Sequence, residues 1–493
     1  MAALSKLRSE SSGGVVARFA SPEFEQLREL AFCRYPDHEW GTFARFGWRK
    51  TPEGLILTLA GLDPPELGDL DEAVGNVAFA EPYTLRVALA AETHPLAVAV
   101  MHSHPQGCAP RPSWVDDDMD RYYADYFSGF APKRPYLSLI FSEINGELAV
   151  SGRVHWEGCW LEVDRVVAER TPLVTSTTRF DQNAPTSSVA RTERLSAAFG
   201  TQATDRLRRA TVAVIGAGGT GSAAIEILAR AGVGRLILVD PDHLEESNLE
   251  RVHGSRPEHA AQRTPKVLIA REHVREIDEQ IEACAFIGSL PQSEVVDAVL
   301  TADVALGCTD QQHSRLALSD LAVRYLLPSI DCGVLLEGRE GIVTGQTAQF
   351  VRFLAADPCA LCRGMIVPTR LAQELMSEVE RAQRRAAADE ARERGEDPDP
   401  YWRDQPQLNT VGYLTTMAGA LTAGYAIGWI TGRFDPPFKR LQMNLVQPFL
   451  DVTDVDDPPR AECTCRRARG RADQAAADAL ITAPAHWTPA RRL

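Results

Sequence analysis

A glycine-rich turn constrains the fold of this chain more than any other feature. Residues 216–221 read GAGGTG, directly after an apolar run at 211–215 and before a helical pattern at 222–231. Glycines between a strand and a helix let a backbone approach phosphate, and the start of the helix favours negative charge. A further apolar run at 236–239 completes a β-α-β unit, so we expect an α/β fold with a doubly wound, Rossmann-like sheet.

The polar residues after this turn indicate which nucleotide binds. Asp240 ends the second run, where an acid commonly holds a ribose, and alone it would predict a dinucleotide-dependent dehydrogenase. Asn248, Arg251 and Lys266 follow, and two cations beside an asparagine suit a triphosphate better than a hydride carrier. Asp310 comes after the strand predicted at 304–306, in the expected ligand crevice, where it could hold Mg²⁺.

The order of these elements resembles the E1-like adenylating family, which includes ubiquitin-type E1 enzymes and the activating enzymes of thiamine and molybdopterin synthesis. The resemblance covers about residues 190–465 and includes Arg191-x-x-Arg194 and Asp310-x4-Arg315. It implies attack of a protein's C-terminal carboxylate on the α-phosphate of ATP, with Arg251 and Asp310 as catalytic residues. The nucleotide-binding residues that it implies are Gly218, Gly219, Asp240, Asn248, Arg251, Lys266, Asp310 and, from the partner of a homodimer, Arg194.

Four cysteines form two pairs about 100 residues apart, Cys359-x-x-Cys362 and Cys463-x-Cys465. Four thiolates would close a tetrahedral zinc site, and the family often carries two Cys-x-x-Cys pairs for a structural zinc. The second pair here has one intervening residue and departs from that pattern. Two unrelated thiol pairs are the alternative.

The nucleophilic cysteine that thioester-forming E1 enzymes carry after the first zinc pair has no counterpart between Cys362 and Cys463. A thioester on this chain would need Cys308 or Cys332, which are as readily explained as buried strand residues. We therefore expect the reaction to stop at the acyl-adenylate, with a separate E2-like thiol protein accepting the acyl group.

A second candidate site lies in the first part of the chain. His102 and His104 follow the apolar run at 96–101, and side chains two apart on an extended segment point the same way. Asp116 lies near the start of a helix predicted at 114–127. Two histidines, an aspartate and an open position describe a catalytic zinc site. Ser113 and Asp116 would also form an ordinary capping box.

This segment resembles the JAMM (JAB/MPN+) metalloprotease family over about residues 22–160. The resemblance implies His102, His104 and Asp116 as zinc ligands, Ser113 as a hydrogen-bond donor near the scissile carbonyl, and Glu39 as the acid–base residue. The spacings from His104 to Ser113 and from Glu39 to Gly41 each differ by one from the usual pattern. Asp117 therefore remains an alternative ligand, and Glu53 a weak substitute for Glu39.

Patterning along the 493 residues predicts a JAMM-like α/β domain at 22–165, a linker at 166–189, an adenylation domain at 190–465 with a charged insert at 371–404, and a tail at 466–493. The net charge of −15 argues against general nucleic-acid binding. The ten cysteines are typical of cytosolic thiols, and no secretory signal is apparent, so we expect a cytoplasmic protein. The apolar run at 411–430 favours a buried core helix over a membrane span.

Both resemblances concern ubiquitin-like proteins with Gly-ending tails. The leading hypothesis is a bifunctional enzyme of a prokaryotic ubiquitin-like pathway: one half adenylates the modifier, and the other trims or removes it. The alternatives are activation of a sulfur-carrier protein for cofactor or natural-product synthesis, and a regulatory scaffold with degenerate sites. Prokaryotic relatives also suggest antiviral defence, which no residue of this chain indicates.

Overall fold

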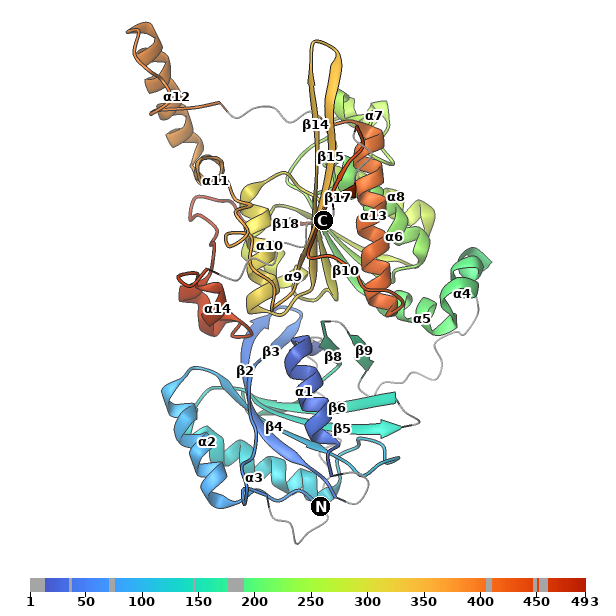
Figure 1. The fold of residues 1–493 in the computed structure, drawn as a ribbon, viewed down its shortest axis with the longest axis vertical. Helices are drawn as coiled ribbons and strands as arrows, with labels where there is room; N and C mark the ends of the chain where they lie inside the picture. The colour runs from blue at the N-terminus through green and yellow to red at the C-terminus, as the bar shows by residue number, and fades with distance from the viewer. Residues whose placement is uncertain are drawn as a thin grey trace.

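The computed structural model describes residues 14–34, 38–70, 76–144, 147–169, 171–175, 190–404, 410–446, 450–451 and 460–493. Within these residues it contains two nine-stranded sheets, one in each half of the chain. The first half lies below the second in Figure 1. The mixed α/β class expected from the sequence is confirmed.

The first sheet has the order β7-β6-β5-β4-β2-β3-β1-β8-β9. Its apolar strand residues alternate between two cores, one under α1 and one under α2 and α3. The strands expected at 54–60, 96–101, 136–141 and 148–156 are all present. The elements are β1 Gly14–Phe19, α1 Ser21–Ala31, β2 Gly41–Thr51, β3 Gly54–Asp63, α2 Glu81–Thr93, β4 Ala97–Ser103, α3 Trp114–Phe130, β5 Tyr136–Ile144, β6 Glu147–Trp156, β7 Cys159–Glu162, β8 Arg165–Ala168 and β9 Thr171–Thr175.

The second sheet has the order β17-β16-β15-β14-β13-β10-β11-β12-β18. Its central strands are parallel, and β10 pairs with both β11 and β13, so the direction of winding reverses at β10. The strands are β10 Thr211–Ile215, β11 Arg235–Val239, β12 Glu282–Ile287, β13 Val304–Gly307, β14 Ser329–Arg339, β15 Ile342–Phe353, β16 Arg440–Asn444, β17 Leu450–Asp451 and β18 Arg491–Arg492.

Helices cover both faces of this sheet, as the doubly wound pattern predicts. One face packs against α6 Gly219–Ala231, α8 Lys266–Ile277 and α13 Gly412–Thr431, and the other against α9 Ser293–Val299 and α10 Gln312–Arg324. The remaining helices are α4 Glu193–Phe199, α5 Thr201–Arg209, α7 Pro257–Ala261, α11 Pro368–Leu375, α12 Glu378–Glu393 and α14 Cys465–Ala468, with short 3₁₀ turns η3 Ala190–Thr192, η4 Glu246–Asn248 and η5 Asp473–Asp478.

The apolar run at 411–430 forms α13, a core helix packed against α6, as expected. The two helices approach closely at Gly419, where a Cβ atom would lie 2.2 Å from the carbonyl oxygen of Thr220. Only glycine allows this approach. Of the helices described, none combines the length and the apolarity that a membrane span requires.

Three boundaries differ from those expected. The first sheet includes β1, which precedes residue 22, and β8 and β9 occupy the start of the expected linker, of which residues 170 and 176–189 lie outside the described residues. The charged insert forms α11 and α12, and α12 projects from the body (Figure 1). The tail expected at 466–493 ends in β18, which pairs with the sheet edge at β12, and the Leu493 amide donates to the carbonyl of Ala285.

A buried arginine joins the two halves. Alternate residues of β1 face opposite ways, so Val15 packs into the first core while Val16 packs among residues of the second half. Arg18 points the same way as Val16 and is 1% exposed. Its guanidinium donates to the carbonyl oxygens of Leu300 and Ala302, each at 2.6 Å. Burial lowers the pKa of Arg18 to about 9, so the side chain remains charged at neutral pH.

Other polar contacts surround this joint. Arg49 of β2 pairs with Asp297 at 2.7 Å, and Arg235 pairs with Glu53 at 2.9 Å. The carboxylate of Glu169 accepts hydrogen bonds from the amides of Ser21 and Ala355, so it connects residues from both halves. Burial raises the pKa of Glu169 from 4.5 to about 7. The two halves therefore form one body with a shared apolar core and a buried polar seam.

Glu169 gives this joint a pH dependence. Because its carboxyl group binds a proton more tightly in the folded chain than in the unfolded chain, its contribution to stability is greatest below pH 4.5 and is lost as the pH rises to about 7. We expect a loss of up to about 3 kcal/mol over this range. A Glu169→Gln variant should lack this component. Urea denaturation of both proteins at a series of pH values measures it, and parallel pH profiles would contradict the assignment.

Candidate functional site

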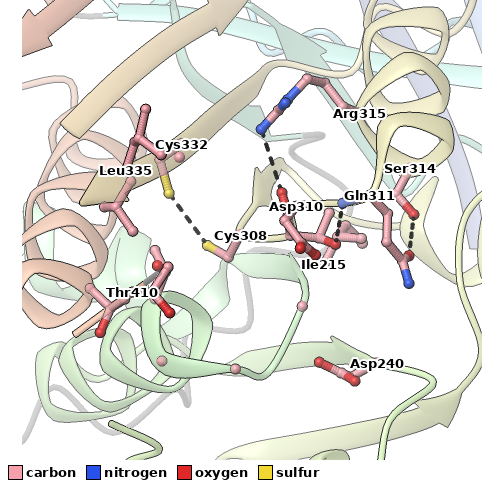
Figure 2. A pocket seen from close by; sticks show the side chains of 18 of the residues that line it. Ile215, Asp240, Cys308, Asp310, Gln311, Ser314, Arg315, Cys332, Leu335 and Thr410 are labelled. Carbon is pink, nitrogen blue, oxygen red and sulfur yellow. Dashed lines mark hydrogen bonds between the residues drawn. The ribbon is translucent and has the colours of Figure 1, made fainter. Parts of the chain in front are cut away.

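A large cavity lies at the carboxyl ends of β10, β11 and β13, where doubly wound sheets bind ligands. Its volume is about 910 Å³. The glycine-rich turn, the ends of the central strands and the start of α10 form one side (Figure 2). Strands β14, β15 and β16 form the other. Among the predicted site residues, those that line it are Gly218, Gly219, Asp240, Arg251, Lys266 and Asp310.

Close backbone contacts explain the glycines of the turn. Gly216 has φ +101°, and a Cβ atom there would lie 2.5 Å from the carbonyl oxygen of Cys308. A Cβ atom on Gly221 would lie 1.8 Å from the carbonyl oxygen of Gly216. The turn is therefore held against β13, and α6 begins at Gly219 beside the cavity. A helix start of this kind favours an anionic ligand.

Asp240 fixes the glycine-rich turn from the neighbouring strand. Its Oδ2 accepts a hydrogen bond from the amide of Ala217 at 2.6 Å, and its Oδ1 accepts one from the amide of Asp242 at 2.8 Å. Burial raises the pKa of Asp240 to about 6. Through its two hydrogen bonds the Asp240 carboxylate positions the glycine-rich turn, and it also faces the cavity (Figure 2).

Two of the predicted cations line the cavity, each beside an acidic residue. Lys266 begins α8, and its ammonium group lies 3.0 Å from a carboxylate oxygen of Asp242. Arg251 lies 3.1 Å from a carboxylate oxygen of Glu250 and donates to the carbonyl of Ser247 at 2.8 Å. Asn248 is buried in η4, accepts a hydrogen bond from the amide of Glu245, and is not among the residues that line this cavity.

Asp310 follows β13 and presents a side chain that is 70% exposed. It lies beside Arg315, whose guanidinium is held at 2.7 Å by the buried carboxylate of Asp331. Arg370 of α11 also reaches Asp310, 3.3 Å from its Oδ2. Burial raises the pKa of Asp331, although the charge of Arg315 opposes that rise.

Arg194 lies apart from this cavity. It belongs to α4, which contributes no buried residue and extends from the edge of the second half (Figure 1). Its side chain is exposed, and it is not among the cavity-lining residues. Within a single chain, Arg194 therefore does not contribute to the nucleotide cavity.

Sequence reasoning missed several residues of the cavity. Arg370 borders the segment that we expected to be only a charged surface insert, and no spacing to a recognised motif marks it. Cys308 and Cys332 were considered, and both line the cavity with their sulfur atoms 3.9 Å apart (Figure 2). Their adjacency follows from the parallel register of β13 and β14, which sequence alone does not give.

The four paired cysteines come together in the second half. Cys359 Sγ lies 3.6 Å from the sulfur atoms of Cys362 and Cys463, and Cys362 Sγ lies 3.8 Å from that of Cys465. A tetrahedral zinc with ligands at about 2.3 Å separates its sulfur atoms by about 3.8 Å. The four sulfur atoms thus have the spacing of a zinc site, and the single residue between the last two cysteines does not prevent it.

His102, His104 and Asp116 form a second cluster of this kind, in the first half. His102 Nε2 lies 3.0 Å from one Asp116 oxygen, and His104 Nε2 lies 3.4 Å from the other. His102 is buried, its Nδ1 has no hydrogen-bond partner among the described residues, and its Nε2 faces the Asp116 carboxylate, so the three side chains offer ligand atoms to one metal ion. Burial would raise the pKa of Asp116, but the two imidazoles hold it well below its usual value.

The alternatives around this cluster are resolved by geometry. Asp117 points away and pairs with Arg153, and Glu53 lies at the opposite end of the β2–β3 hairpin, paired with Arg235. Neither belongs to the cluster. Ser113 is exposed and forms a capping box with Asp116 at the start of α3.

Glu39 lies near the cluster. It precedes β2, whose Gly41 pairs with His102 of β4, and its Oε2 accepts a hydrogen bond from the amide of Val77 at 3.1 Å. Burial would lower the pKa of His104, but Asp116 and the charge of Glu39 raise it. The carboxylate of Glu39 therefore acts electrostatically on this group of residues.

The parallel sheet, the glycine-rich turn and the cation-lined cavity define a nucleotide-binding α/β domain. Comparison with known families then identifies it: the model of the ThiF family matches residues 190–466, more than half of the chain. The chain belongs to the ThiF family.

Curated relatives share part of this region. Over 136 residues the chain is 28% identical to "Sulfur carrier protein ThiS adenylyltransferase" of Bacillus subtilis (28% of this chain, 40% of the relative). Over 166 residues it is 35% identical to "Adenylyltransferase and sulfurtransferase uba4" of Emericella nidulans (33% of this chain, 34% of the relative). The alignments thus span 40% of the first relative and 34% of the second. The structure of E. coli MccB with ATP is 18% identical with a TM-score of 0.42, covering 55% of this chain and 74% of that one.

The two clusters predict two zinc ions per chain. A Cys359→Ser variant should lose one of them and unfold at a lower temperature, because four clustered thiolates, three of them buried, depend on the ion. A His104→Ala variant should lose the other and keep the first. Elemental analysis after dialysis against metal-free buffer measures both, with Cys159→Ser, which changes an exposed cysteine, as control. Unchanged zinc in either cluster variant would contradict the corresponding site.

Proposed function

We propose that the second half adenylates the C-terminal carboxylate of a small carrier protein with a Gly-ending tail. The observation that carries this proposal is the cavity itself: a glycine-rich turn at a helix start, facing Arg251, Lys266 and an exposed Asp310. Membership of the ThiF family supports it, and relatives that share this region are named adenylyltransferases.

In the proposed reaction, the carrier's carboxylate attacks the α-phosphate of ATP, and pyrophosphate leaves. The backbone around Gly218 and Gly219 lies where it would contact phosphate, and Asp240 lies where a ribose would bind. Negative charge gathers on the phosphates as the bond breaks, so Arg251 and Lys266 would stabilise the transition state. Mg²⁺ bound at Asp310 would neutralise part of this charge.

The names of the relatives favour a sulfur carrier as substrate. One relative is named for the sulfur carrier ThiS, and others are named as sulfurtransferases as well as adenylyltransferases. The lack of a cysteine between Cys362 and Cys463 also suits an enzyme that stops at the acyl-adenylate. Forming a thiocarboxylate on the carrier then requires no cysteine of this chain and no E2-like protein, whereas forming a conjugate would require an E2-like protein. Conjugation of a ubiquitin-like modifier remains the second candidate.

Arg194 motivates a proposed homodimer. The family resemblance assigns this arginine to the partner's nucleotide, and its exposed place on α4, away from its own cavity, fits that role. In such a dimer each cavity would receive one cation from the other chain.

The first half is proposed to be a zinc hydrolase of the JAMM type that trims the carrier or releases it from a conjugate. His102, His104 and Asp116 would hold the zinc, which makes a bound water nucleophilic near neutral pH. Glu39 is close enough to influence His104 and would transfer the water's proton. Ser113 is exposed at the helix start and would donate to the scissile carbonyl.

The two proposed sites lie at opposite ends of the molecule. Strand β2 begins beside the histidines and ends at the joint between the halves, and the joint contacts the amino end of β11 and the residues just before β13. The nucleotide cavity is at the carboxyl ends of those strands. A tail trimmed at one site must therefore leave it before the same chain can adenylate it.

Separate sites predict separable activities. His102→Ala should abolish tail processing and leave ATP–pyrophosphate exchange within about twofold, whereas Asp310→Ala should lower exchange by at least about a hundredfold and leave processing intact. A panel of ubiquitin-like and sulfur-carrier proteins, with and without tail extensions, serves as substrate. Exchange only after the extension is removed would identify a trim-then-activate enzyme.

Two results would contradict the proposed function. Loss of both activities in either variant would contradict independent sites. Failure of the unaltered protein to bind ATP would contradict the adenylation proposal and favour a scaffold.

A further inference from the structure

Helix α11 places one charged side chain, Arg370, against the nucleotide cavity and a second, Glu374, against the start of α10. The helix follows the Cys359–Cys362 pair, and its Leu371 and Leu375 pack against an apolar core of the second half. These contacts hold the helix in position next to the loop that carries Asp310. Arg370 and Glu374 then lie one helical turn apart, with 3.3 Å between their charged groups.

Glu374 anchors the start of α10. Its two carboxylate oxygens accept hydrogen bonds from the backbone amides of Gln312 and His313, and one of them lies 2.8 Å from the His313 ring. Burial would raise the pKa of Glu374, but these contacts with His313 and the amides lower it. Because α10 begins two residues after Asp310, Glu374 fixes the loop on which Asp310 lies.

Arg370 contacts Asp310 itself. Its guanidinium donates to the Asp310 carbonyl oxygen at 2.9 Å and lies 3.3 Å from the carboxylate. The Arg370 side chain is 22% exposed and lines the cavity, whereas its carboxylate partner is 70% exposed. This pair is therefore held by one backbone contact and one weak, solvent-exposed contact.

The cations of the cavity differ in how firmly they are held. Arg315 is held by the buried carboxylate of Asp331, so its charge is already neutralised inside the protein. Arg370 donates through Nε to Glu374 at 3.3 Å, whereas its terminal nitrogen faces the exposed carboxylate of Asp310, which the proposed function assigns to Mg²⁺. A carboxylate that binds a divalent cation is a poorer acceptor for a guanidinium, which then has donors for another anion.

We propose that Arg370 binds the β- and γ-phosphates of ATP, the part that leaves as pyrophosphate. This inference rests on the proposed nucleotide site and adds a residue to it. Asp310 holds the guanidinium at the edge of the cavity, and the terminal phosphates replace the carboxylate as its partner when the metal–nucleotide complex binds. A planar guanidinium matches phosphate oxygens in pairs, which a lysine does not.

The test compares the binding of ATP, pyrophosphate and AMP by calorimetry, in the presence of Mg²⁺, to the full chain and its variants. Arg370→Ala should weaken ATP and pyrophosphate binding by about tenfold or more and leave AMP binding within about twofold. Arg370→Lys should recover part of the loss. Arg384→Ala is the matched control, because Arg384 lies on α12 in an exposed pair with Glu380.

Three outcomes would overturn the assignment. ATP binding that Arg370→Ala leaves unchanged would remove Arg370 from the site. Equal weakening of ATP and AMP binding would show a structural effect on the cavity. Unchanged nucleotide binding together with weaker binding of a carrier's tail would assign Arg370 to the carboxylate. No ATP binding by the unaltered chain would instead refute the proposed function itself.

Discussion

The nucleotide cavity depends on the contact between a glycine-rich turn and the strands on either side of it. No side chain fits at Gly216 or Gly221 without striking a backbone carbonyl, and Asp240 holds the turn through the amide of Ala217. The turn, β13 and β11 are thereby fixed together at the point where the sheet reverses its winding. The anion-binding helix start and the cations that face it take their places from this arrangement.

A second constraint is the buried polar seam between the halves. The buried guanidinium of Arg18 donates hydrogen bonds to two backbone carbonyls, and the carboxylate of Glu169 accepts hydrogen bonds from amides on both sides of the seam. Truncating either side chain would leave buried polar groups without partners, which costs far more than the loss of an exposed ion pair. The seam holds the two proposed sites apart at opposite ends of one body. In the proposed function, the carrier is therefore released from one site before the other binds it, and no domain movement is required.

The sequence predicted local features well because their physical causes are local. Periodic apolar runs and glycines determine strands and turns, and the ligand spacings of His102, His104 and Asp116 depend on a few neighbouring residues. The four cysteines were expected to meet across about 100 residues, and the structure brings their sulfur atoms together. The short strands β8, β9 and β18 were not among the expected elements, because strands this short acquire their structure from the sheet they join.

Contacts between distant segments could not be read from the sequence. In the sequence, Arg18 is one polar residue of a short strand, and nothing marks it as buried by the second half of the chain. Arg370 is likewise one of many charges at the border of a charged insert. Their significance comes from the carbonyls of Leu300 and Ala302 and from Asp310, which only the fold brings near. Asn248 illustrates the opposite case: it occupies the position in the sequence that the family pattern predicts, but it does not line the cavity.

The central claim is that a carboxylate attacks the α-phosphate of ATP in this cavity. The most direct measurement uses a carrier protein that supports ATP–pyrophosphate exchange. Its C-terminal carboxylate is labelled with heavy oxygen, and the activated acyl group is captured with hydroxylamine. Mass spectrometry of the products then locates the label. We predict AMP that carries one heavy oxygen from the carrier. Label in inorganic phosphate, together with ADP, would show attack on the γ-phosphate and would contradict adenylation.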